Sequence, residues 1–193
     1  HQHGGNNMTA QYTGKGAILS ADGRYRYLLW REWRGTHDRR NWRWLGAKDG
    51  AGQEMGEPKP CVFVMLNPSM ADGAIDDPTI RKCVGFARRW SYERLEVVNL
   101  FAYRATQPRD LLTLPPNVDP VGPDNSEHFD DLIERAGIIV CAWGAHGAHL
   151  GQDETALGWL RDKPRYALLL TKDGHPGHPL RVPYATDLRR FRP

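Results

Sequence analysis

Residues 61–90 decide the fold, and they read CVFVMLNPSMADGAIDDPTIRKCVGFARRW. The first six residues are apolar on both faces, which is typical of a central strand in a parallel sheet. A polar turn at Asn67-Pro68-Ser69 follows. Asp77 then has the chemistry of a helix N-cap, with Pro78 at the first helical position. Apolar residues recur at helical spacing as far as Trp90, so the stretch predicts a strand, a sharp turn and a helix.

Further apolar segments predict the rest of a sheet. The run LEVVN at 95–99 follows the helix and completes a right-handed strand–helix–strand unit. The runs IIVCAW at 138–143 and YALLL at 166–170 predict a third and a fourth strand, with helices before and between them. The expected fold class is therefore α/β, a three-layer sandwich around a four-stranded, mainly parallel central sheet.

Residues 24–45 are unusually rich in aromatic and basic side chains, reading RYRYLLWREWRGTHDRRNWRWL. Strand-forming aromatic residues lie on both sides of Gly35, which predicts an N-terminal β-hairpin or two edge strands. Two interpretations stay open. Arginine interleaved with tryptophan suits a nucleic-acid groove, whereas a sheet edge would place tryptophan inward and arginine outward. Residues 47–60 have no periodicity and predict a loop.

Length and composition are those of one soluble domain. The chain has 193 residues and a net charge of +3, which is compatible with nucleic acid without requiring it. The segment HQHGGNN before Met8 resembles a tag remnant, so the expected domain covers 8–193. No apolar run reaches the roughly 18 residues of a membrane helix, and no leader is recognisable. The three cysteines predict buried thiols in a reducing cytoplasm, and we expect a monomer without cofactor or metal.

Polar residues follow each of the four predicted strands. Because the carboxyl ends of parallel strands meet at one sheet edge, these residues are expected to converge there. The groups are Asn67-Pro68-Ser69, Asn99-Leu100-Phe101, Trp143-Gly144-Ala145-His146 and His175-Pro176-Gly177-His178-Pro179. Convergence of two amides, an aromatic ring and several imidazoles predicts a ligand site at this edge.

These motifs resemble a bacterial and phage family known as domain of unknown function 1643. The similarity covers most of the chain and rests on the runs MLNPSMADGAIDDPTIRKCVGFA, VVNLFAYRAT, CAWGAHG and LTKDGHPGHPLRVP. A more distant resemblance links the chain to the uracil-DNA glycosylase superfamily. Asn67-Pro68 is similar to the first motif of that superfamily, Asn99 to its second, and His178-Pro179 to its last.

The second resemblance implies a uracil-DNA glycosylase-like fold and roles for individual residues. Asn67 would position the water that attacks C1′, Asn99 would bind a flipped base, and Phe101 would stack on it. His178 would stabilise the charge on the leaving base. Pro68, Ser69, Trp143, Gly144, His146 and His175 would complete the substrate-binding set. The implied function is a DNA glycosylase-like N-glycosidic hydrolase on single- or double-stranded DNA.

Other residues give weaker signals. Asp72 and Asp76 follow the Asn-Pro turn, and Asp72 is the candidate general base or metal ligand. Arg104, Arg109 and Arg181 are candidates for contacts with the nucleic-acid backbone. Two alternatives to a glycosylase stay open: a non-catalytic reader of a modified base or nucleotide, and a small-molecule hydrolase or transferase that uses Asp72 or Asp76.

Overall fold

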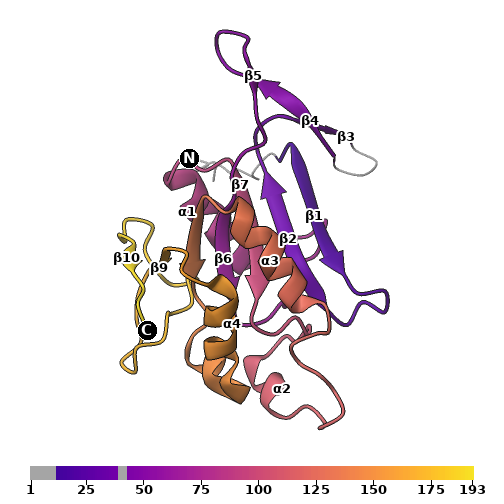
Figure 1. Cartoon of the computed structure of the whole chain (residues 1–193), viewed down its shortest axis with the longest axis vertical. Helices are drawn as coiled ribbons and strands as arrows, with labels where there is room; N and C mark the ends of the chain where they lie inside the picture. Colours follow the sequence, from indigo (N-terminus) through magenta and orange to yellow (C-terminus); the bar gives the residue numbers. More distant parts are fainter. Residues whose placement is uncertain (1–11, 39–42) are drawn as a thin grey trace, which may run out of the picture.

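A mainly parallel sheet with helices on both faces forms the body of the protein (Figure 1). The computed structural model describes residues 12–38 and 43–193, so the proposed tag remnant lies outside the described residues. The main sheet has seven strands in the order β1-β2-β7-β6-β8-β9-β10. Their bounds are β1 Gly14–Leu19, β2 Arg26–Glu32, β6 Cys61–Met65, β7 Arg94–Asn99, β8 Ile138–Cys141, β9 Arg165–Ala167 and β10 Arg189–Arg190.

The four predicted core strands are confirmed and lie in the centre of this sheet. β6 pairs in parallel with β7 and with β8, and β8 pairs in parallel with β9. All five residues of β6 are buried, as expected for a strand covered on both faces. The expectation of only four strands is wrong, because antiparallel pairs extend the sheet at both edges.

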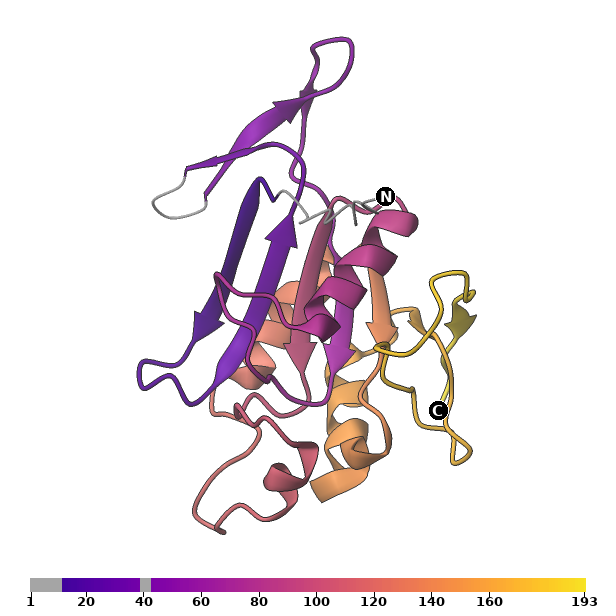
Figure 2. The same cartoon turned by 180° about the vertical axis from the view of Figure 1, so that it is seen from behind.

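The helices form two layers around the sheet (Figures 1 and 2). α1 (Pro78–Arg89) packs on one face, where the buried residues of its apolar stripe join the side chains of β6. α3 (Asn125–Arg135) and α4 (Gln152–Leu160) cover the opposite face. The predicted cap is confirmed, since Asp77 Oδ1 accepts a hydrogen bond of 2.8 Å from the Ile80 N–H. The remaining helical pieces are α2 (Pro108–Leu112) and the 3₁₀ helix η1 (Ala145–Gly151). No helix in the described part of the chain is long and apolar enough to cross a membrane.

The N-terminal hairpin is formed by different strands from those expected around Gly35. β1 and β2 pair antiparallel, and β2 continues the main sheet by pairing with β7. The chain does break near Gly35, but the next strand, β3 (Thr36–Asp38), belongs to a second sheet. β2 therefore pairs with β7, which lies far away in the sequence, and does not pair with the segment that follows Gly35.

A small sheet of three strands contains part of the segment predicted to be a loop. β4 (Arg43–Lys48) pairs with β3 and with β5 (Glu54–Met55), so residues 47–60 are partly extended. Figure 1 shows this sheet beyond the end of the main sheet that lies opposite the carboxyl ends of β6 and β7. It therefore lies away from the edge at which the polar turns gather.

The arginines of β2 are buried, so the interpretation that places arginine outward and tryptophan inward is wrong for this strand. Arg26 is only 2% exposed and Arg31 is fully buried, whereas Trp30 is partly exposed. Arg31 donates to the Asp72 carbonyl at 2.6 Å and forms an ion pair of 2.7 Å with Asp76. The loop after β6 supplies these acceptors, which is why a strand that reads as half charged lies in the interior. Trp42 lies outside the described residues.

Candidate functional site

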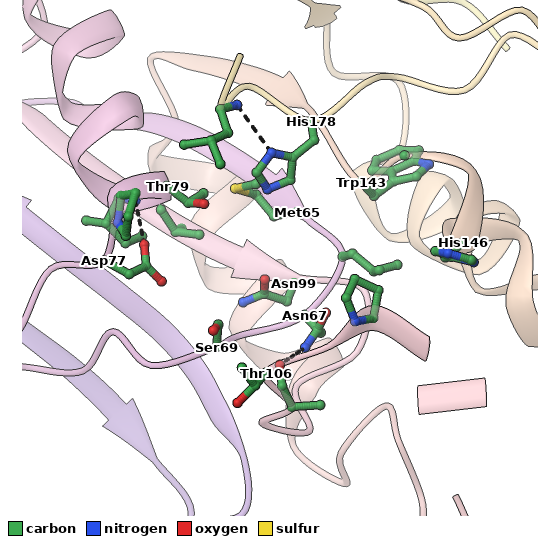
Figure 3. A pocket seen from close by; sticks show the side chains of 18 of the residues that line it. Met65, Asn67, Ser69, Asp77, Thr79, Asn99, Thr106, Trp143, His146 and His178 are labelled. Atoms are coloured by element: carbon green, nitrogen blue, oxygen red, sulfur yellow. Dashed lines mark hydrogen bonds between the residues drawn. The ribbon is translucent and has the colours of Figure 1, made fainter. Parts of the chain in front are cut away.

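A cavity of about 480 Å³ lies at the carboxyl ends of β6, β7 and β8. The chain passes from β6 through α1 to β7 on one side, whereas β8 continues to β9 on the other side. The connections therefore reverse direction between β6 and β8, and a reversal of this kind is the usual ligand site in open α/β sheets. Seven predicted site residues line the cavity: Asn67, Ser69, Asn99, Trp143, Gly144, His146 and His178 (Figure 3).

Asn67 is held by its own turn and by the loop that follows β7. Its Nδ2 donates to the Pro68 carbonyl at 3.0 Å and to the Ala105 carbonyl at 2.8 Å. Both bonds use the amide nitrogen, so the side-chain oxygen Oδ1 keeps its acceptor capacity beside the cavity. The chemistry open to Asn67 is therefore acceptance of a hydrogen bond from a water or a ligand.

Asn99 presents an unsatisfied amide to the cavity. The residue is 1% exposed, and its Nδ2 has no hydrogen-bond partner among the described residues. The backbone of β7 at this point is well satisfied, because Asn125 Nδ2 donates to the Asn99 carbonyl at 2.9 Å. Leaving a buried amide donor unpaired is costly, so a ligand that accepts from Nδ2 would remove a penalty.

His178 is oriented as a neutral donor. Its Nδ1 accepts a hydrogen bond of 3.2 Å from the Leu180 N–H, which leaves Nε2 to carry the proton. Desolvation lowers the pKa of His178 below its ordinary value, although the Asp77 charge acts in the opposite direction. Part of the side chain is open to solvent, and the residue also borders the cavity (Figure 3). At neutral pH the imidazole can therefore donate a hydrogen bond without bringing a full positive charge.

The turn after β8 and the loop that carries His178 hold one another in place. The Gly144 N–H donates to the Pro176 carbonyl at 2.7 Å, with Gly144 at a positive φ of 73°. Gly177 packs so closely on Leu169 that a Cβ at this position would lie 2.2 Å from a Leu169 methyl carbon. These contacts fix the backbone next to His178, so the imidazole reaches the cavity from a supported loop.

Other residues that line the cavity were not predicted as site residues, among them the polar residues Arg26, Asp77 and Thr79. Asp77 and Thr79 stand at the start of α1, whose N-terminal end points toward this edge of the sheet. Asp77 was interpreted only as a helix cap, and the structure gives it a place in the cavity wall as well. Arg26 lies on β2, and no sequence pattern signals that β2 is placed beside β7.

Several predicted site residues lie outside the cavity. Asp72 Oδ1 accepts from the Ala74 and Ile75 N–H groups at 2.7 and 2.9 Å, and these bonds lower its pKa. Asp72 thus organises its own turn and does not line the cavity, which disfavours it as a general base. Phe101 is fully buried in the core, because the chain turns inward after β7, so the expected stacking surface is covered.

The remaining candidates are also placed elsewhere. Pro68 is buried beneath the turn, where its carbonyl accepts from the Ala105 N–H, and His175 is absent from the cavity lining. Arg109 and Arg181 are exposed, whereas Arg104 is half-buried and donates to the Gly23 carbonyl at 3.4 Å. The backbone-contact role of the three arginines stays a prediction, with Arg104 the least accessible of them.

The comparisons with known proteins identify the family and go no further. The chain belongs to the family described as a protein of unknown function (DUF1643), whose model matches residues 26–180. That match spans β2 to the His178 loop and so includes the cavity. No curated protein and no solved structure matches the chain.

Proposed function

We propose that this member of the DUF1643 family is a DNA base-processing enzyme, a glycosylase-like protein that acts on a flipped uracil-type or modified base. The observation that carries the proposal is the open amide of Asn99 in a cavity at the carboxyl edge of a parallel sheet. A side-chain amide offers a donor and an acceptor side by side, which matches the hydrogen-bonding edge of a nucleobase. A cavity of about 480 Å³ lies in the size range of small-ligand sites. A uracil-DNA glycosylase-like topology is part of the proposal.

In the proposed reaction, Asn99 holds the base while the bond between C1′ and the base nitrogen breaks. The bonding electrons stay on the base, and the His178 Nε2–H donates to the oxygen on which the negative charge develops. Asn67 Oδ1 accepts from a water whose oxygen then bonds to C1′, and the proton lost from that water passes to solvent. The leaving base takes up a proton in turn, so charges and atoms balance.

DNA contact in this proposal depends on the exposed cations at the two loops next to the cavity. Arg109 follows the strand end that carries Asn99, and Arg181 follows His178. Either side chain can meet a phosphate while a base occupies the cavity, and such contacts give affinity without sequence preference. A cytoplasmic monomer without cofactor stays part of the same hypothesis.

A non-catalytic reader of a modified base is the second candidate. Two observations favour it: Asp72 is engaged by its own turn, and the amide nitrogen of Asn67 is bonded to backbone carbonyls. Asp77 is the only carboxylate among the described residues that line the cavity, and one of its oxygens already caps α1. A cavity that offers hydrogen-bond donors to a base but no free carboxylate to activate a water would bind the base without cleaving its bond to the sugar.

The test is a panel of single strands and duplexes that carry uracil or a modified pyrimidine, assayed for abasic sites. A glycosylase produces abasic sites, and His178→Gln should slow their formation about 10²-fold while binding persists. His128→Gln is the matched control, because His128 stacks on Tyr27 away from the cavity. Binding of the panel without abasic sites would remove the enzyme and leave the reader. Absence of both would remove the whole proposal.

A further inference from the structure

Among the described residues, Arg26 at the wall of the cavity is a buried cation without an ion-pair partner. It is 2% exposed, and Nη1 donates to the Ala71 carbonyl at 2.7 Å. In the described part of the chain, its Nε has no hydrogen-bond partner and no carboxylate forms an ion pair with it. Arg31 on the same strand is equally buried but has an ion pair with Asp76. The two arginines therefore differ in that only Arg26 retains unused donor capacity.

The charge of Arg26 is retained at a cost. Burial lowers its pKa to about 10, so the guanidinium is still protonated at neutral pH. The charges of Asp77 and Asp72 act to keep it charged, whereas those of Arg104 and Arg31 act against it. A buried cation without a close counter-charge is destabilising, and a bound anion would supply the missing partner.

The first turn of α1 adds uncharged donors beside Arg26. Pro78 has no N–H, and the Ile80 N–H is bonded to Asp77, which leaves the Thr79 N–H as the open donor of this turn. The hydroxyls of Ser69 and Thr79 border the same cavity. A helix N-terminus with surrounding hydroxyls and an arginine suits the several oxygens of a phosphate better than the two oxygens of a carboxylate.

We propose that Arg26 and the first turn of α1 form a phosphate subsite, so that the cavity takes a nucleotide unit in preference to a free base or nucleoside. Asp77 lies in the same wall and disfavours a second negative charge. The subsite therefore prefers the single charge of a phosphodiester, as in a nucleic-acid strand, to the double charge of a phosphate monoester. The inference rests on the proposed function for the nucleotide class of the ligand.

The experiment measures binding of three probes by calorimetry: deoxyuridine, deoxyuridine 5′-monophosphate and the trinucleotide d(TUT). The trinucleotide should bind the unmodified protein at least about tenfold more tightly than deoxyuridine, since a charge-assisted contact is gained. Arg26→Met keeps the length of the side chain and should abolish that difference. Arg26→Lys, which keeps the charge but not the planar fork, should retain part of it.

Arg24→Met is the matched control, because Arg24 is an exposed cation two residues away that pairs with Asp22. It removes the same charge and should leave the preference intact. Arg26→Met should fold, since an apolar side chain in place of a buried unpaired cation is neutral or stabilising, and its thermal midpoint checks this directly.

Tightest binding of the trinucleotide, lost in Arg26→Met, supports the subsite. Tightest binding of the monophosphate, lost in Arg26→Met, overturns the preference for a phosphodiester and identifies free nucleotides as the source of phosphate. Equal affinity for all three probes, no binding of any of them, or a preference that survives in Arg26→Met overturns the inference. Abasic-site formation is scored separately. A phosphate preference without cleavage therefore contradicts only the enzyme proposal, and cleavage without a phosphate preference contradicts only the subsite.

Discussion

The two ends of the β2–β7 strand pair both bury polar side chains, but they satisfy them differently. At one end Arg94 donates to Glu32 and to Glu96 at 2.8 Å each, and Arg135 donates to both oxygens of Glu96. At the other end Asn99 Nδ2 and Arg26 Nε have no partner among the described residues, and both residues line the cavity.

The difference separates polar groups whose partners lie within the fold from polar groups that lack such partners. Burying a charge or an amide is tolerated where partners replace water, as they do around Glu96. Where partners are missing, the molecule carries a penalty that packing elsewhere must offset. A ligand with matching donors and acceptors would remove that penalty, which is why we propose the ligand site at this end.

The largest expected effect on stability comes from a substitution at the end of the strand pair that contains Glu96. Glu96→Ala should lower the free energy of unfolding by about 3–5 kcal/mol, because it leaves Arg94 and Arg135 without the buried carboxylate between them. Urea unfolding measures this, with Asp131→Ala as the control, since Asp131 pairs with Arg135 at the surface. A loss below about 1 kcal/mol, typical of a surface pair, would show that this end is not a structural anchor.

Glu32 predicts a pH dependence at the same end. Desolvation raises its pKa from 4.5 to about 7, with the Arg94 bond acting in the opposite direction. The folded state then holds a proton that the unfolded chain releases near pH 4.5. The contribution of Glu32 to stability is therefore greatest below that pH and is lost as the pH rises through about 7.

Unfolding titrations at about pH 5 and about pH 8 should show a part of the pH dependence that disappears in Glu32→Gln. Identical pH dependence in the two proteins would mean that Glu32 keeps an ordinary pKa.

Asn67→Ala should have an intermediate effect on stability. The substitution removes two hydrogen bonds to backbone carbonyls and is expected to cost about 1–3 kcal/mol. Loss of packing alone would give a smaller cost, because a turn amide contributes no core packing. Thermal unfolding decides between the two, and a midpoint equal to that of the unmodified protein would contradict the structural role of the amide.

Asn99→Ala should have the smallest effect on stability and a large effect on binding. Asn99 Nδ2 has no hydrogen-bond partner to lose among the described residues, so the free energy of unfolding should change by less than about 1 kcal/mol. Binding of a uracil-containing strand should weaken at least about tenfold. Asn125→Ala is the opposite case, because Asn125 Nδ2 bonds the Asn99 and Leu100 carbonyls and its loss should destabilise the fold. Equal losses of stability in the two variants would remove the distinction.

The core of the fold could be predicted from local sequence because its signals are local. The apolar run of β6, the Asp77-Pro78 start of α1 and the polar residue after each strand are readable within a few positions. Parallel pairing then follows from alternation of strands and helices. The converging strand ends at Asn67, Asn99 and Trp143 are a consequence of that topology.

What sequence could not supply depends on distant partners. Arg26 and Arg31 read as exposed charges until the loop at 71–76 supplies acceptors for them. Phe101 reads as a ring at a ligand edge, but the chain turns into the core one residue after β7 and buries it. Asp72 looks like a free catalytic carboxylate in the sequence. In the structure it accepts hydrogen bonds from the backbone of its own turn, and the residue types alone do not determine the shape of that turn.

The most direct test of a ligand site at the Asn99 end is the side-chain amide signal of Asn99, followed by nuclear magnetic resonance while a uracil-containing strand is added. A base bound in the cavity should shift the Asn99 NδH₂ resonances strongly and leave those of Asn125 nearly unchanged, because Asn125 is already bonded to the backbone. Resonances of Asn99 that stay in place while the strand binds would contradict the account and move the binding site elsewhere on the molecule.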